Sequence, residues 1–312
     1  MKALQINQYG GTDAIVINND AELPIVEGGK ILVQVYAASL NRIDSAIRNG
    51  NLKESLHLPM PLNLGGDFAG VVSEVGEAVT EFKKGDEVYG NAGPFKGGSG
   101  SLAEYTLANV ANTAKKPSSL DFSEAAALPL AGVSALQGIE EEIKLASGQK
   151  ILIIGGAGGI GSLAIQIAKL RGAYVAATAA TDDIEFVKRL GADEVIDYKT
   201  QDVTKVLKEY DAVFDTAGGE QLNTLFDVLK KGGILVTMAG QPDQEIAEQH
   251  EVKAISQMTQ VTTKQLTNLA ASVDLGNVNV SIEKTFPLSE GKQAFEYFET
   301  QHPKGKIVIN IK

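Results

Sequence analysis

The chain has 312 residues, a formal net charge of −11 at pH 7, 44% hydrophobic residues and 21% charged residues. This composition is typical of a globular protein with an ample core, and the negative charge disfavours nucleic acid and anionic membranes as partners. The chain has no cysteine, which excludes disulfides, a catalytic thiol and thiolate metal ligands.

Other signals for metal binding or membrane insertion are missing from the sequence. His57, His250 and His302 lie far apart and in no metal-ligand spacing. Residues 1–11 lack the apolar core of a signal peptide, and the apolar stretches are too short to span a membrane. We therefore expect no metal site and a cytoplasmic location. At about 150 residues per domain, the length suggests two domains.

The first third of the chain predicts a β-rich region, and the middle predicts an alternation of strands and helices. Short alternating or β-branched runs occupy 2–6, 13–19, 30–40, 70–76 and 86–92. Alanine-rich helical runs interrupted by Pro129 follow over 121–141. Strand patterns then occupy 150–155, 173–178, 194–198, 212–217 and 233–240, with helical patterns at 163–170, 182–191, 202–209 and 222–232. This order predicts an α/β fold with a parallel sheet covered on both faces.

The last part of the chain changes character again. Residues 252–258 could add one more strand, with a helix over 264–274. A strand pattern at 278–288, an amphipathic helix at 289–301 and a strand at 305–312 follow. We expect this tail to return to the first domain and to complete it.

A glycine-rich segment between the first strand and helix of the middle region carries the clearest chemistry. Its residues fit the pattern G-x-G-x-x-G: Gly156, Ala157, Gly158, Gly159, Ile160 and Gly161. The glycines would permit a sharp turn, close approach of backbone N–H groups to a diphosphate and close packing of the helix on the strand. The helix N-terminus adds unpaired N–H groups and partial positive charge. The alternative is a plain glycine-rich turn, but the strand and helix on either side favour dinucleotide binding.

The ends of the other strands predict the rest of a nucleotide site. A carboxylate that binds the ribose of NAD is expected about 20 residues after the glycines, and the chain has Thr178, Ala179, Ala180 and Thr181 there. This favours NADP(H), although Asp182 and Asp183 follow, where they suit the first turn of a helix capped by Thr181. Further candidates are Tyr198 and Lys306 for the phosphate, and at the strand ends Ala217, Gly218, Met238, Ala239 and Gly240.

Five segments together resemble the medium-chain dehydrogenase/reductase superfamily, and most closely its zinc-independent quinone oxidoreductase branch. They are NRIDSAIRNG at 41–50, the glycine-rich stretch 64–90, ALPLAGVSALQGI at 127–139, RLGADEVIDY at 189–198 and HPKGKIVINI at 302–311. The resemblance implies a GroES-like β-rich domain split between the two chain ends, at 1–120 and 266–312. It also implies a doubly wound Rossmann domain at 121–265 and a homodimer formed through 252–261.

The resemblance further implies hydride transfer from NADPH to a quinone or an α,β-unsaturated carbonyl. The zinc enzymes of the superfamily have metal ligands where this chain has Asn41, Gly66 and a position near Ala131, so no zinc is expected. Asn41 is the candidate catalytic residue, through a hydrogen bond to the acceptor oxygen or to the nicotinamide edge. It could instead cap local backbone. Ser134 stands where the family has a threonine beside the nicotinamide ribose.

Two alternatives stay open at this point. Ala46 stands where several quinone reductases have an aromatic residue, which weakens the case for a quinone and suits an enone or a larger quinone. The second alternative is that the protein is a non-catalytic nucleotide-binding or sensing protein on the same fold, because fold alone does not establish function. Asp44 and Arg48 favour a local ion pair or helix-end pair over a catalytic role. No dedicated acid is evident, and solvent could supply the proton.

Overall fold

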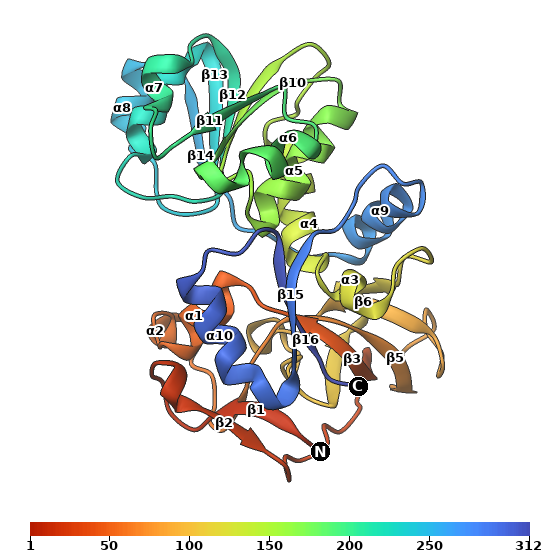
Figure 1. Cartoon of the computed structure of the whole chain (residues 1–312). Coiled ribbons are helices and arrows are strands. Elements are labelled where there is room, and N and C mark those ends of the chain that lie inside the picture. The colour runs from red at the N-terminus through yellow and green to blue at the C-terminus, as the bar shows by residue number, and fades with distance from the viewer. The chain divides into compact units, whose positions relative to one another are not determined.

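The computed structural model describes residues 1–312 and divides the chain into two compact units (Figure 1). Unit one comprises Met1–Ala131, Val261–Gly276 and Val280–Lys312, and unit two comprises Gly132–Gln260 and Asn277–Asn279. The sequence-based division has its boundaries at 121 and 266, whereas unit two begins at Gly132 and unit one resumes at Val261. In both descriptions the two ends of the chain share one unit.

Unit two is built on a parallel sheet of six strands in the order β11-β10-β9-β12-β13-β14. Its strands are β9 (Lys150–Ile154), β10 (Tyr174–Ala179), β11 (Glu194–Asp197), β12 (Tyr210–Asp215), β13 (Leu229–Thr237) and β14 (Lys253–Ser256). This is the doubly wound dinucleotide-binding order, in which successive strands are added on one side of β9 and then, from β12 on, on its other side. The predicted α/β fold is confirmed, including the additional strand at 252–258.

Helices cover both faces of this sheet because its strands are apolar on both sides. They are α5 (Gly159–Leu170), α6 (Ile184–Arg189), α7 (Val203–Val206) and α8 (Gln244–Gln249), and α4 (Pro129–Leu136) is the segment in which the chain passes from unit one to unit two. Figure 1 shows α5 and α6 at one side of the sheet and α7 and α8 at the other. Leu152, Val213 and Leu235 from the sheet are fully buried in the core on the α7 and α8 side.

The helix predicted over 222–232 is wrong. Leu222–Val228 forms a 3₁₀ helix, and the chain then enters β13 at Leu229. Leu222, Leu225 and Phe226 are buried, so the apolar spacing that favoured an α-helix instead packs a tighter turn against the sheet. The glycines at 232 and 233 lie inside the strand, where Gly232 has φ +76°.

Unit one contains two sheets. The small sheet has the order β2-β1-β4, and the large one has the order β15-β16-β3-β5-β6-β8, with β7 paired to β3. Their strands are β1 (Ala3–Ile6), β2 (Ile15–Asn18), β3 (Lys30–Ser39), β4 (Leu62–Asn63), β5 (Asp67–Val75), β6 (Glu87–Asn91), β7 (Tyr105–Asn109), β8 (Thr113–Lys115), β15 (Ile282–Pro287) and β16 (Lys306–Asn310). The sequence pattern missed β4, β7 and β8, whose runs are short and include polar residues.

Short helices connect these strands. They are α1 (Arg42–Arg48), α2 (Lys53–Leu56), α3 (Phe122–Ala126), α9 (Thr263–Asp274) and α10 (Gly291–Thr300), with single turns at Thr12–Ala14, Pro94–Lys96, Val110–Asn112 and Leu288–Glu290. Unit two has a further single turn at Thr181–Asp183 and a π-helix at Gln137–Glu142. Pro129 ends the first alanine-rich run and starts α4, as its position in the pattern predicts. No helix has the length and hydropathy needed to cross a bilayer.

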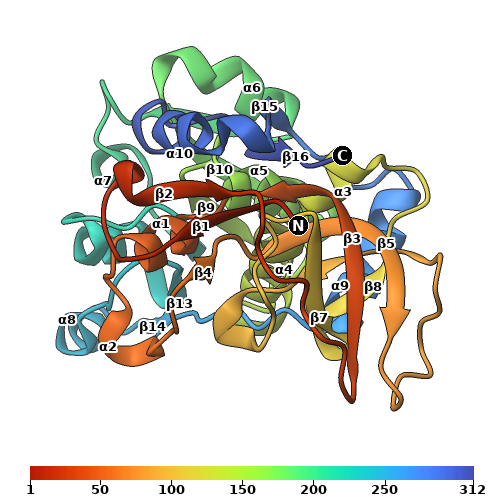
Figure 2. The same ribbon diagram turned by 90° about the horizontal axis from the view of Figure 1, so that it is seen from below.

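The C-terminal tail returns to the N-terminal strands, as predicted. β16 pairs antiparallel with β3, with Val308 opposite Ser39. Phe295 and Phe298 of α10 share one buried core with Leu4 and Ile6 of β1. Figures 1 and 2 both show α10 beside the N-terminal strands. The tail therefore supplies core side chains as well as a central strand of unit one.

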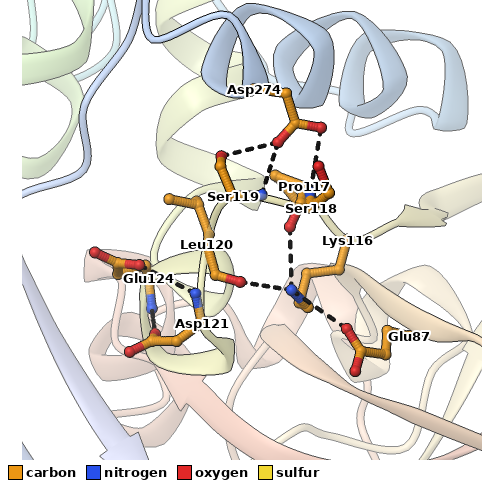
Figure 3. A network of polar contacts seen from close by, with 9 residues as sticks. All are labelled: Glu87, Lys116, Pro117, Ser118, Ser119, Leu120, Asp121, Glu124 and Asp274. Atoms are coloured by element: carbon orange, nitrogen blue, oxygen red, sulfur yellow. Dashed lines mark hydrogen bonds and ion pairs between the residues drawn. The ribbon is translucent and has the colours of Figure 1, made fainter.

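A polar network ties α9 to unit one (Figure 3). The Asp274 carboxylate at the end of α9 accepts hydrogen bonds from the backbone N–H groups of Ser118 and Ser119. The buried ammonium of Lys116 donates to the carbonyls of Pro117 and Leu120 and lies 3.3 Å from a Glu87 carboxylate oxygen. These contacts fix the segment that leads into α3, so α9 belongs with the β-rich unit.

Candidate functional site

The glycine-rich segment connects β9 to α5 in unit two. Gly155 leaves the strand with φ +78°, a conformation that favours glycine. Its N–H donates to Thr178 Oγ1 at 3.0 Å, and the Gly156 N–H donates to the Thr178 carbonyl at 2.9 Å. Thr178, at the end of the neighbouring strand, therefore holds the start of the loop in place.

Gly161 lies where α5 passes closest to this loop. A Cβ at this position would lie 2.1 Å from the carbonyl oxygen of Gly155 and 2.9 Å from the Cα of Gly156. Both neighbours are backbone atoms, so a side chain would push the helix away from the loop. By contrast, a Cβ on Gly158 would have no neighbour closer than 3.5 Å. Gly161 is thus needed for the close packing of α5 on the loop. Gly158 is not needed for packing, and its lack of a side chain leaves the backbone open to a ligand.

The first turn of α5 presents free backbone donors. Ser162 is the first residue of this helix whose N–H finds a backbone acceptor, the Gly158 carbonyl at 2.9 Å. Gly159, Ile160 and Gly161 precede it, and the helix has no side-chain N-cap. The three N–H groups and the partial positive charge of a helix of 12 residues make an anion site. This site lies beside β9, where the strand order reverses and dinucleotides bind in folds of this type.

A buried carboxylate that the sequence interpretation missed organises the ends of β12 and β13. Asp215 is fully buried, and its Oδ1 accepts the N–H groups of Ala217 and Gly218. Its Oδ2 accepts the Thr237 hydroxyl at 2.8 Å, and Thr237 Oγ1 accepts the Ala239 N–H at 3.0 Å. The aspartate thereby brings the two predicted segments together. An aspartate directly before a glycine-containing turn is the signal that could have indicated it.

The glycines in these two segments have the backbone freedom that the turns require. Gly218 has φ +69° and Gly240 has φ +115°. A Cβ on Gly218 would lie 2.5 Å from the Ala239 carbonyl oxygen. Met238 continues from β13, with its N–H bonded to the Asp215 carbonyl. All five predicted residues of these segments therefore lie at the carboxyl edge of the sheet.

The ends of β10 and β11 carry the residues predicted to contact the adenosine end of a cofactor. Thr178 and Ala179 are buried, and Tyr198 is 58% exposed, with its N–H bonded to the Ala179 carbonyl. The expected helix cap at Thr181 is wrong, because its hydroxyl instead donates to Asp197 Oδ2 at 2.7 Å and α6 begins at Ile184. This hydroxyl, together with the Lys199 N–H, lowers the pKa of Asp197.

Ser134 is fully buried in α4. Its hydroxyl lies 2.7 Å from Thr259 Oγ1, and its carbonyl accepts Gln257 Nε2 at 3.0 Å. Thr259 and Gln257, just after β14, are partners that no sequence motif pointed to.

Asn41 lies in unit one at the junction of β3 and α1, where it is the N-cap residue. Its side-chain amide has a charged partner at each end. Nδ2 donates to Asp67 Oδ2 at 2.9 Å, and Oδ1 accepts the Lys306 ammonium at 2.5 Å. Its backbone N–H donates to Asp44 Oδ2 at 2.7 Å. Asn41 does cap α1, but its amide belongs to a buried charged cluster, which we define as Asn41, Asp44, Asp67 and Lys306.

Burial shifts the pKa of each ionisable group in this cluster. Loss of hydration raises the pKa of Asp67, opposed by the Lys306 charge and by hydrogen bonds from Asn41 and Asn91. It lowers the pKa of Lys306, opposed by the two carboxylates. It raises the pKa of Asp44 to about 7. Such perturbed groups gather at functional sites more often than elsewhere.

Lys306 is predicted from the sequence to contact a cofactor phosphate, but its hydrogen-bond partners in the structure are groups of the protein itself. The side chain is in unit one and only 4% exposed, and Nζ donates to the Leu40 carbonyl at 2.8 Å as well as to Asn41. A buried ammonium bonded in this way does not favour the predicted contact with a cofactor phosphate. Arg48 pairs with Glu299 at 3.0 Å, so the predicted ion pair with Asp44 is wrong, whereas Asp44 in the first turn of α1 and Arg48 in its last turn fit the helix-end alternative.

Asp44 makes the stability of the protein depend on pH. Its folded-state pKa of about 7 lies above the ordinary value of 3.8, so the folded chain holds this proton more tightly than the unfolded chain. The contribution of Asp44 to the free energy of unfolding should therefore fall as pH rises from about 4 to about 7. The expected loss is at most about 4 kcal/mol, since the two pKa values differ by about 3 and one pKa unit corresponds to about 1.4 kcal/mol.

Denaturant unfolding of wild type and Asp44→Asn across pH 4–8 checks this expectation. Asparagine keeps an acceptor for the Asn41 N–H, so Asp44→Asn should flatten the curve and be the more stable protein at pH 8. Glu124 makes the same capping contact at the start of α3, where its carboxylate accepts the Asp121 N–H, but it is not buried, so the slope for Glu124→Gln should stay close to that of wild type. An unchanged slope in Asp44→Asn would contradict the assignment.

A small pocket opens beside α1 within unit one. It is lined by Asp44, Ile47, Asn63, Leu64, Gly65, Pro94 and Phe95. Phe95 comes from the glycine-rich loop after β6, which sequence patterns interpret as a surface connection. Phe95 thus brings an aromatic ring near Asp44. The family resemblance leads one to expect such a ring at position 46, where this chain has Ala46.

Comparison with known proteins agrees with this architecture. Residues 27–118 match the alcohol dehydrogenase GroES-like domain, and residues 190–309 match a family described as zinc-binding dehydrogenase. An NADPH-dependent alkenal/one oxidoreductase from Arabidopsis thaliana is 38% identical over 321 residues, covering 99% of this chain and 79% of the relative. A 2-methylene-furan-3-one reductase from Solanum lycopersicum is 37% identical over 322 residues, with coverage of 99% and 79%.

A solved structure has the same fold. The quinone oxidoreductase from Coxiella burnetii superposes with a TM-score of 0.91 at 34% identity, covering 100% of this chain and 99% of that one. With two relatives above one-third identity along almost the whole chain, the similarity extends over both units. The chain belongs to the medium-chain dehydrogenase/reductase superfamily, in the branch that contains the quinone and alkenal oxidoreductases.

Proposed function

We propose that the protein is an NADPH-dependent oxidoreductase that transfers hydride to a quinone or an α,β-unsaturated carbonyl compound. The observation that carries the proposal is the β9–α5 loop, with three free N–H groups and a glycine that permits the helix to approach. The named activities of the relatives from Arabidopsis and tomato support the same reaction class.

The loop and the neighbouring strand ends would hold the dinucleotide. Gly158 to Gly161 would bind the diphosphate through backbone N–H groups, and Ala217 and Gly218 with Met238 to Gly240 would line the next part of the site. Thr178, Ala179 and Tyr198 would lie toward the adenosine, where no carboxylate of β10 repels a 2′-phosphate. Ser134 would contribute near the nicotinamide ribose.

When bound, NADPH supplies the hydride, and the chain has to bind, orient and polarise the acceptor. Hydride addition to the β-carbon of an enone, or to a quinone, moves negative charge onto the carbonyl oxygen. Asn41 would donate a hydrogen bond to that oxygen from the N–H that Asp67 does not use.

We propose that no zinc takes part. The residues do not fit a zinc ion, because the chain has no cysteine and the Asn41 oxygen already binds an ammonium. A histidine at position 66 would not fit either, since even a Cβ there would lie 2.8 Å from Asn91 Nδ2. Elemental analysis of the purified protein should find no stoichiometric zinc.

The decisive experiment measures oxidation of NADPH and NADH with a panel of 2-alkenals, 2-alkenones and quinones. We expect turnover with at least one acceptor and a higher kcat/KM for NADPH than for NADH. Tight NADPH binding without turnover on any acceptor would favour the non-catalytic nucleotide-binding alternative. A preference for NADH would overturn the cofactor assignment. A homodimer and a cytoplasmic location stay predictions, which sedimentation and cell fractionation would check.

A further inference from the structure

Lys306 is a buried cation without a role in the reaction described so far. It begins β16, which lies beside β3 through backbone pairing, so the C-terminal strand delivers its ammonium to the end of β3. Two of its three N–H donors are used, one by the Leu40 carbonyl at 2.8 Å and one by Asn41 Oδ1 at 2.5 Å. A buried lysine is costly unless its charge is compensated, so this placement calls for an explanation.

The Asn41 amide lies between this cation and a carboxylate. Asp67, on the other side, accepts Asn41 Nδ2 and is itself held by Asn91 Nδ2 at 2.8 Å and by the Leu130 N–H at 3.1 Å. An ammonium can only donate and a carboxylate can only accept. The oxygen of the amide must therefore face Lys306 and its nitrogen must face Asp67, and the flipped amide would place like groups against each other.

This arrangement leaves one hydrogen of Asn41 Nδ2 uncommitted and fixes its direction. A cation on the carbonyl oxygen also draws electron density from the nitrogen, which makes that remaining N–H a stronger donor. We propose that Lys306 is a positioning residue that orients and polarises the Asn41 amide toward the oxygen of the hydride acceptor. The inference rests on the proposed function for what the amide binds, but the placement of the amide itself can be tested separately.

The competing explanation is that Lys306 only balances the buried charge of Asp44 and Asp67. The cluster offers a variant that separates the two roles. The Asp44 carboxylate accepts the backbone N–H of Asn41 and has no hydrogen bond to the Asn41 side-chain amide. Replacing Asp44 by asparagine therefore removes a negative charge and leaves the contact between Asn41 and Asp67 in place.

The experiment compares wild type, Lys306→Met, Asp44→Asn and the double variant Lys306→Met/Asp44→Asn. Each is assayed for kcat and KM with an enone, for the Kd of NADPH and for thermal stability. We expect Lys306→Met to lower kcat by about 10–100-fold, with an NADPH Kd within about twofold of wild type, the size expected for misplacing one hydrogen-bond donor. The double variant should recover stability but keep the low kcat.

A second readout does not require turnover. The two side-chain N–H resonances of Asn41 can be assigned by their absence in Asn41→Ala. We expect them to shift in Lys306→Met and in the double variant, and to stay near the wild-type position in Asp44→Asn. If the wild-type protein shows no turnover, only the proposed function is overturned. The Asn41 resonances would then still test whether Lys306 positions the amide. Unshifted resonances in Lys306→Met, or recovery of kcat in the double variant, would overturn the role of Lys306.

Discussion

Gly161→Ala is expected to weaken NADPH binding at least tenfold and to lower the free energy of unfolding by about 1–3 kcal/mol, the usual cost of overpacking. The new Cβ would lie 2.1 Å from the Gly155 carbonyl oxygen, so α5 and the loop must separate. Separation moves the free N–H groups at the start of the helix away from the position that a diphosphate would occupy. Calorimetric titration with NADPH and denaturant unfolding measure the two effects.

Gly158→Ala is the matched variant in the same loop. Its Cβ would have no neighbour closer than 3.5 Å, so the free energy of unfolding should stay within about 0.5 kcal/mol of wild type. If Gly158 is needed so that a diphosphate can approach the backbone, NADPH affinity should still fall. Wild-type affinity in both variants would remove this loop from the cofactor site.

Asn41→Ala is expected to lower kcat for the preferred acceptor by about 100-fold, the typical loss for one donor to a developing oxyanion. The proposed cofactor residues belong to unit two, so the Kd of NADPH should change by less than about twofold. The substitution also leaves Lys306 and Asp67 without the amide that bridges them. Stability should therefore fall as well, and steady-state kinetics have to be measured where the variant is fully folded.

Asn91→Ala controls for that loss of stability. Asn91 is a buried amide that donates to the same carboxylate, Asp67, at 2.8 Å. Its removal should destabilise the cluster to a similar extent but reduce kcat by less than about fivefold. If kcat falls to a similar extent in Asn41→Ala and Asn91→Ala, the intact cluster is what matters for kcat. That result would contradict the proposed role of Asn41 as a hydrogen-bond donor to the acceptor oxygen.

The pH dependence expected from Asp44 bears on how these variants are assayed. The pKa of Asp44 lies at about 7 because of burial, so its protonation changes over the pH range in which such enzymes are usually measured. Variants that alter the charge of the cluster should therefore be compared at several pH values. A difference seen at one pH alone could reflect the charge of Asp44 and not the position of Asn41.

Part of the fold and site could be predicted because the signals are contiguous in the chain. The strand at 150–154, the glycines that follow and the helix at 159–170 are neighbours in sequence, so hydrophobic period and glycine spacing suffice to predict them. The α-helix expected at 222–232 is wrong because the local pattern there does not distinguish between two structures. An apolar spacing of three and four fits a 3₁₀ turn followed by a strand as well as it fits an α-helix, and only packing on the sheet decides.

The sequence by itself determined a dinucleotide-type βα junction and a chain whose two ends form one unit. Only the tertiary structure decided what surrounds Asn41, since its partners Asp67 and Lys306 come from β5 and β16, which are separated from it by 26 and 265 residues. The pairing of Asp215 with Thr237 is of the same kind. Local backbone preferences act between near neighbours, whereas buried charges find their partners through strand pairing, which brings distant segments together only in the folded chain.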